Sequence, residues 1–127
     1  MLTRMRRPFS IARRRTVVED EFYRCTVCGE ELYLPGQAEA VYTQAAARIR
    51  EQEGLLPPER IREIRRRYRL PQRRFEKLLG TGKNTVVRWE RGTGFQSPAA
   101  DSLLRLIEAR PENAQLLAEM HGVELPG

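Results

Sequence analysis

Hydrophobic residues recur three or four positions apart through the second half of the chain, and this spacing predicts a run of amphipathic helices. Ile61, Ile64 and Tyr68 share one helical face directly after Pro57 and Pro58. Because proline is favoured at the first position of a helix, a first helix is expected to begin there, with arginines on its outer face.

A pair of shorter helices follows, joined by a glycine turn. The first opens at Pro71 and stops at Gly80, where a helix C-terminus favours a left-handed residue. The second is expected over residues 83–91 and ends at Gly92. Their inward-facing positions are Phe75, Leu78, Leu79, Val86 and Trp89. Two such helices, with a polar outer face on the second, predict a helix-turn-helix.

Two more helices are predicted beyond this motif. Ser97 and Pro98 suit a helix cap and a first turn, and Arg110 with Pro111 repeats the arrangement. Leu103, Leu106 and Ile107 suit packing on the helix-turn-helix. Four further positions suit either the core or a two-fold partner: Leu104, Leu116, Leu117 and Met120. Residues 58–127 are therefore expected to form one five-helix domain with a dimer surface.

Residues 1–57 follow a different pattern. One side of residues 37–53 carries Ala38, Val41, Ala45 and Ile49, which predicts a linking helix. Before it, "RRRTVVEDEFYRC" has the Val, Phe and Tyr content of a strand pair. The opening segment "MLTRMRRPFSI" is expected to be a mobile basic arm. The predicted fold is thus mainly α, with a small β segment ahead of the helices.

The length of 127 residues allows one compact domain with an appendage but no large enzyme core. No apolar run approaches the roughly 18 residues of a membrane span, and no secretory signal follows the arginine-rich start. We therefore expect a soluble, cytoplasmic protein without membrane contacts. The single histidine, His121, has no acid or nucleophile placed near it by any motif. No catalytic residue is assigned and no enzyme is predicted.

Positive charge is concentrated in two zones. The net charge is +6, and residues 1–15 hold six arginines without an acid, while residues 58–93 hold twelve Lys or Arg against four Glu. Clustered cations suit a polyanion, because phosphate neutralisation depends on local charge. A solvated helix face is the ordinary alternative for such a run. The helix-turn-helix inside residues 58–93 favours nucleic acid.

The stretch "LPQRRFEKLLGTGKNTVVRWERG" resembles the Xre-type helix-turn-helix. The matching positions are Leu70, Gln72, Gly80, Trp89, Glu90 and Gly92. The order of parts over residues 13–120 is similar to the MqsA (YgiT-type) antitoxins of bacteria: a cysteine knuckle, an acidic linking helix and a helix-turn-helix. Pro71 departs from the Thr or Ser usual in that family at the helix cap. The resemblance implies a bacterial DNA-binding regulator with a toxin protein as a further partner.

In the resembled family an Asn and an Arg four positions apart on the recognition helix read base edges, and they correspond to Asn84 and Arg88. Asn bonds bidentately to adenine and Arg to guanine, and positions four apart lie on one helical face. The alternative role of Asn84 is a local helix cap. The basic arm and the first helix are expected to contact the DNA backbone. Further backbone contacts are expected from Gln72, Arg73, Arg74, Lys83 and Thr85.

Cys25 and Cys28 form one knuckle of a structural zinc site, which normally has four ligands. In the resembled family another Cys-x-x-Cys completes the site, but here "MLTRMRRPFSI" stands in that place without a ligand. One chain offers only the two cysteines and the distant His121. We therefore expect a metal-free knuckle packed on the linking helix. A zinc site shared between two chains is the alternative.

These patterns predict a sequence-specific transcriptional regulator that binds double-stranded DNA. It is expected to be a homodimer that represses its own operon at a palindromic operator, and to be the antitoxin of a type II toxin-antitoxin system. The alternative is a protein-neutralising module in which residues 1–57 bind a toxin enzyme and DNA binding is secondary. A palindrome overlapping the promoter favours the first function, and a neighbouring small toxin gene favours the second.

Overall fold

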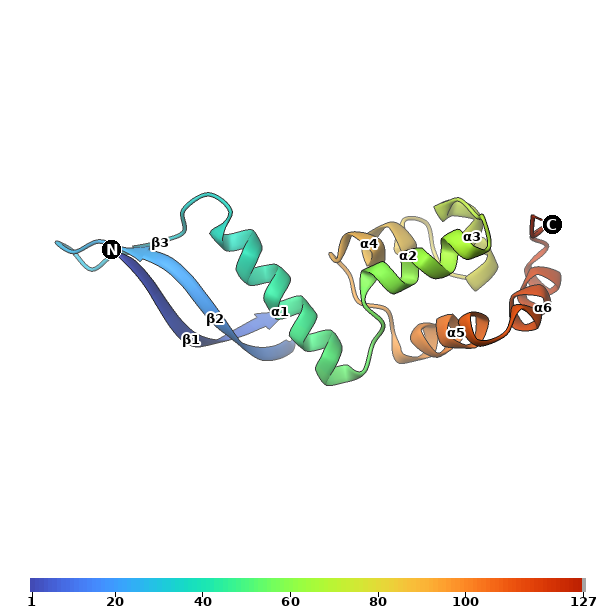
Figure 1. Ribbon diagram of the computed structural model, residues 1–127, viewed down its shortest axis with the longest axis horizontal. Coiled ribbons are helices and arrows are strands. Elements are labelled where there is room, and N and C mark those ends of the chain that lie inside the picture. Colours follow the sequence, from blue (N-terminus) through green and yellow to red (C-terminus); the bar gives the residue numbers. More distant parts are fainter. Residues whose placement is uncertain (127) are drawn as a thin grey trace. The chain divides into compact units, whose positions relative to one another are not determined.

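Residues 1–126 are described in the computed structural model of the chain, and they divide into two compact units. The N-terminal unit comprises Met1–Gly54, and the C-terminal unit begins at Leu55. In the described part of the chain, the first unit contains all the strands and one helix, and the second is entirely helical (Figure 1). The fold is therefore mainly α with an N-terminal β segment, as predicted.

The N-terminal unit is a three-stranded antiparallel sheet with one helix packed against it (Figure 1). Across the sheet the order is β1 (Leu2–Ile11), β2 (Arg14–Arg24) and β3 (Glu31–Leu32). The helix α1 (Gln37–Glu53) has the bounds predicted for the linking helix. Ala12 and Arg13 join β1 to β2 with φ of 52° and 79°, the positive values that a two-residue hairpin turn favours.

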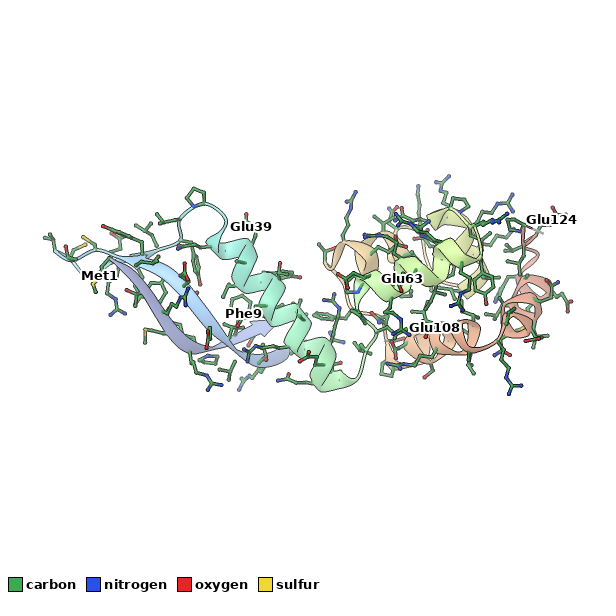
Figure 2. The ribbon with its side chains drawn as sticks, viewed as in Figure 1. Met1, Phe9, Glu39, Glu63, Glu108 and Glu124 are labelled. Atoms are coloured by element: carbon green, nitrogen blue, oxygen red, sulfur yellow. The ribbon has the colours of Figure 1, made fainter. Side chains whose placement is uncertain are left out.

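The expectation of a mobile N-terminal arm is wrong, because the segment forms β1 and every residue of the strand is in register with β2. One buried apolar cluster of the unit is formed by Val18, Val41 and Ala45, with Phe9 and Ile11 packed against them. Figure 2 shows Phe9 between the sheet and α1. The alternation of Phe9 and Ile11 is a strand signal that the density of arginines obscured in the sequence. Pro8 is tolerated because β1 is an edge strand.

The C-terminal unit contains the five predicted helices. They are α2 (Pro58–Arg67), α3 (Gln72–Leu79), α4 (Thr85–Arg91), α5 (Pro98–Ala109) and α6 (Pro111–His121). Ser97 caps α5 as expected, since its hydroxyl oxygen accepts a hydrogen bond from the Ala100 N–H at 3.1 Å. The third predicted helix differs at its start, because α4 begins at Thr85 and not at residue 83.

One hydrophobic core holds these helices together. Its members include Ile61, Ile64, Leu70, Phe75, Leu78, Val86, Trp89, Leu104 and Ile107. The prediction that Trp89 and Val86 face inward is thereby confirmed, as is the burial of Ile107. Leu106 was expected to pack on the helix-turn-helix, and this expectation is wrong because 55% of the residue is exposed.

Candidate nucleic-acid interface

A buried carboxylate on α4 fixes the helix-turn-helix to the preceding helix. The Glu90 side chain is only 2% exposed and accepts hydrogen bonds from Arg65 of α2, at 2.7 Å to one oxygen and 2.9 Å to the other. Gln72 of α3 donates to the same carboxylate at 3.2 Å. A bidentate Arg–carboxylate pair restricts orientation as well as distance. Glu90 therefore sets the position of α4 against both α2 and α3.

The environment of Glu90 keeps it ionised. Burial alone would raise the pKa of this carboxyl, but the hydrogen bonds from Arg65 and Gln72 outweigh burial and hold the pKa below its ordinary value. Arg62 adds a weaker ion pair at 3.5 Å and donates to the Glu90 carbonyl oxygen at 3.1 Å. The negative charge at this point is therefore matched by cations of α2.

A second buried carboxylate, on Glu76 of α3, organises the turn between α3 and α4. One Glu76 oxygen accepts a hydrogen bond at 2.9 Å from the Val86 N–H, which belongs to the first turn of α4. Backbone N–H groups at a helix start have no partner within the helix, and the residue at the N-cap usually supplies one. Here the supplier lies on the preceding helix. No sequence pattern indicates this role of Glu76, because its partner is a backbone group that only the fold brings near.

The position of Asn84 follows from this arrangement. Asn84 occupies the N-cap position of α4, but its side chain makes no capping hydrogen bond. Its backbone is left-handed, with φ of 66°, a conformation that Asn tolerates better than most residues. The sequence placed Asn84 on the recognition helix, but in the structure it lies just before the first residue of α4. The alternative role, a side-chain cap of this helix, is not observed either.

Asn84 and Arg88 nevertheless lie one helical turn apart. The Asn84 carbonyl oxygen accepts the Arg88 N–H at 3.2 Å, which is the first hydrogen bond of α4. Both side chains are exposed, and neither has a hydrogen bond or ion pair among residues 1–126. The two predicted base-reading groups are thus adjacent and available to a ligand.

The residues expected to contact the DNA backbone fall into two groups. Arg73, Arg74 and Lys83 are exposed and have no intramolecular polar partner within the described residues. Gln72 is half-buried and held by Glu90, and Thr85 is half-buried. Figure 2 shows nitrogen-tipped side chains projecting from the ribbon around α3 and α4. Arg73 and Arg74 lie in the first turn of α3 and Lys83 directly precedes Asn84, while Gln72 has a structural role in addition to any contact.

Four of the five arginines of α2 bind side-chain or backbone oxygens of the C-terminal unit. The sequence had led us to expect that the arginines of this helix contact DNA phosphates. The four are Arg60, Arg62, Arg65 and Arg67. Arg60, for example, forms an ion pair of 2.6 Å with Glu108 of α5. Arg66 is exposed and has no such partner in residues 1–126. The positive face is therefore centred on α3 and α4.

The cysteine knuckle is the loop between β2 and β3. The Cys25 N–H donates to the Glu30 carbonyl at 2.8 Å, and the Gly29 N–H donates to the Cys25 carbonyl at 3.0 Å. Hydrogen bonds from the backbone of Cys28 and Val27, and then from the Cys28 thiol, lower the pKa of Cys25 to about 7. Among the described residues, no group of three or more Cys, His, Asp or Glu side chains is placed so that it could hold a metal ion. Two thiols alone do not make a closed tetrahedral zinc site.

An ionic and aromatic cluster next to the knuckle joins the three strands. Glu31 of β3 binds Arg7 of β1 at 2.8 Å and Arg24 of β2 at 2.7 Å. The Arg7 guanidinium also lies 4.0 Å from the centre of the Phe22 ring, within the range of a cation–π contact. The knuckle was expected to pack on the linking helix. In the structure, these contacts instead connect the two ends of the knuckle loop to the sheet.

We expect the purified chain to bind less than a tenth of an equivalent of zinc, because each chain offers only Cys25 and Cys28 as a pair of ligands. Elemental analysis after expression with added zinc measures this directly. Under reducing conditions both thiols should react with a maleimide, whereas zinc-bound thiolates would be protected. Half an equivalent of zinc per chain, lost in Cys25→Ser together with dimer stability, would show that two chains share a site.

The C-terminal unit is a helix-turn-helix domain, and in the sequence it follows a small β–α unit that carries one Cys-x-x-Cys knuckle. Residues 4–121 match the family described as the antitoxin component of a bacterial toxin-antitoxin system, MqsA. The chain belongs to this antitoxin family. No helix in residues 1–126 has the length and hydrophobicity needed to cross a membrane.

Two curated antitoxins are similar to the chain. Antitoxin MqsA of Escherichia coli (strain K12) is 27% identical over 107 residues, which cover 83% of this chain and 82% of that protein. Antitoxin HigA-2 of Vibrio cholerae serotype O1 is 31% identical over 65 residues, or 51% of this chain and 62% of that protein. An antitoxin role, and with it a toxin partner, is therefore supported independently of the site geometry.

Proposed function

We propose that this antitoxin is a dimeric, sequence-specific DNA-binding regulator that represses its own operon. The observation that carries the proposal is the hydrogen bond from Val86 to Glu76. Because Glu76 satisfies the helix start, the Asn84 side chain is released from capping and is exposed one turn before Arg88. Asn and Arg are the side chains that bond bidentately to adenine and guanine in the major groove.

A two-fold dimer places two such surfaces in successive major grooves, about one helical turn of DNA apart. Three exposed apolar residues on α5 and α6 support a contact between chains: Leu106, Leu116 and Met120, which are 55%, 58% and 68% exposed. Selection of bound duplexes from a random pool tests the proposal. We expect a palindrome with half-sites about one turn apart, and recovery of no common sequence would contradict it.

We expect Asn84→Ala and Arg88→Ala each to weaken binding to the selected site by about 1 to 3 kcal/mol. Binding to scrambled DNA of the same length should change far less, since base contacts carry the sequence information. Titrations of both duplexes at one salt concentration measure the difference. Arg110→Ala is the control, because Arg110 is an exposed arginine at the α5–α6 junction. Equal losses on both duplexes would remove Asn84 and Arg88 as base readers.

A second function, holding the toxin with the N-terminal unit, is favoured by a row of exposed apolar residues. Leu2, Tyr23 and Leu32 are neighbours in the strand register, and they are 55%, 39% and 45% exposed. Coexpression with a small toxin encoded beside the gene tests this role. Tyr23→Glu should abolish the rescue of growth while leaving DNA binding intact, and full rescue by this variant would exclude the row from the toxin contact.

A further inference from the structure

The arginines of the N-terminal unit divide into those that pair with acids and those that do not. The paired ones are Arg4 with Glu21, Arg7 with Asp20 and Glu31, Arg14 with Glu53, and Arg24 with Glu31. The side chains of Arg6, Arg15 and Arg48 have no hydrogen bond or ion pair within residues 1–126. Glu19 lies opposite Arg6 in the strand register, yet no ion pair joins them in this part of the chain.

These three arginines line a single groove of about 460 Å³, whereas Arg13, which also has no such partner in residues 1–126, lies outside it. Arg6 comes from β1, Arg15 from β2, and Arg48 from α1. The other lining residues are Pro8, Thr16, Val17 and Gln52, and no acidic side chain is among them. Since like charges in one groove repel each other, a bound anion would lower the electrostatic energy of this arrangement.

The remaining walls restrict the kind of anion. The Thr16 hydroxyl accepts a hydrogen bond from the Gln52 side chain at 3.1 Å, so the hydroxyl hydrogen is free to donate. Pro8 and Val17 face each other across the strands and add an apolar wall. Three guanidinium groups with an added hydroxyl donor suit the several oxygens of a phosphate better than the two of a carboxylate.

We propose that this groove binds phosphate groups, with the organic part of the ligand against Pro8 and Val17. The site lies in the N-terminal unit and uses none of the residues assigned to base reading, so it goes beyond the proposed function. The same chemistry is offered by a free polyphosphate or nucleotide and by a nucleic-acid backbone. The groove is built on strands and a helix, in contrast to the mobile arm expected from sequence.

In the first arm of the test, pyrophosphate is titrated into the full chain. Calorimetry and the amide chemical shifts of residues 6–17 measure its binding. The double variant Arg15→Gln/Arg48→Gln should weaken pyrophosphate binding at least about tenfold, because charged hydrogen bonds are lost. Arg13→Gln is the matched control, since Arg13 is an exposed arginine of the β1–β2 turn outside the groove. Equal weakening by the control and the double variant would overturn the proposal.

The second arm identifies the source of the phosphate. If the ligand is a DNA backbone, the double variant should reduce the salt dependence of binding to a long duplex by up to about two phosphate contacts, and Arg13→Gln should not. Absence of both pyrophosphate binding and this change in salt slope would refute the proposal that the groove binds phosphate. Pyrophosphate binding by a chain that binds no DNA would instead refute the proposed function, while phosphate binding by the groove would be supported.

Discussion

Glu90→Ala is expected to lower the free energy of unfolding of the C-terminal unit by about 3 to 5 kcal/mol. The substitution removes the partner of Arg65, whose side chain is only 15% exposed, and leaves that guanidinium without its matching charge. It also removes the acceptor of the Gln72 amide. Urea unfolding followed by the fluorescence of Trp89, the single tryptophan, measures the loss.

The control for this experiment is Glu119→Ala, which removes an exposed acid of α6 and should change stability by less than about 0.5 kcal/mol. The pH dependence gives a second readout. Because the pKa of Glu90 is lowered in the folded state, its contribution is present above the ordinary carboxyl pKa of about 4.3 and is lost as pH falls through the lowered value. The Glu90→Ala variant should therefore lose less stability than the parent on acidification. A loss below about 1 kcal/mol at neutral pH would contradict the role given to Glu90.

Phe22→Ala should unfold the N-terminal unit, with an expected cost of about 3 to 5 kcal/mol. Phe22 is 2% exposed and lies against the guanidinium of Arg7, in a unit whose cluster of buried apolar side chains is small. Loss of the β-sheet amide signals measures the effect. The signals of residues 55–126 are expected to persist, since that unit has its own core. Val27→Ala is the control, because Val27 is 94% exposed.

Simultaneous loss of the amide signals of both units in Phe22→Ala would show that the N-terminal unit is needed for the C-terminal helices to fold. Retention of all β-sheet signals would show that Phe22 contributes far less than its burial indicates. Either result is read from one spectrum, because the two units differ in secondary structure.

The helical part of the fold was predictable because its signals are local. Hydrophobic spacing, prolines at helix starts and glycines at helix ends placed all five helices of the C-terminal unit. The start of α4 was missed by two residues, since Asn84 is left-handed and Glu76 provides the cap from another helix. Contacts between segments distant in sequence, such as Glu90 with Arg65, leave no spacing pattern that one sequence can reveal.

The N-terminal unit was harder to predict for a different reason. The charge of the first fifteen residues dominated the interpretation, although Phe9 and Ile11 carried the period of two that indicates a strand. Whether an arginine binds a neighbour or a ligand depends on the strand register. Arg4 and Arg7 have acidic partners, whereas Arg6 between them has none in the described chain. The register, and with it the phosphate groove, came only from the structure.

If Asn84 and Arg88 read bases as proposed, the left-handed backbone at position 84 affects how the operator preference of the protein diverges through mutation. Few residues other than Asn, Asp and Gly adopt φ near 66° without strain, so most codon changes at position 84 carry a folding cost before any change in base preference is tested. Arg88 lies in regular helix, where most side chains are accommodated. On the proposed base reading, new operator sequences are therefore expected to arise first at the base opposite position 88, while the base opposite Asn84 stays the same across descendants.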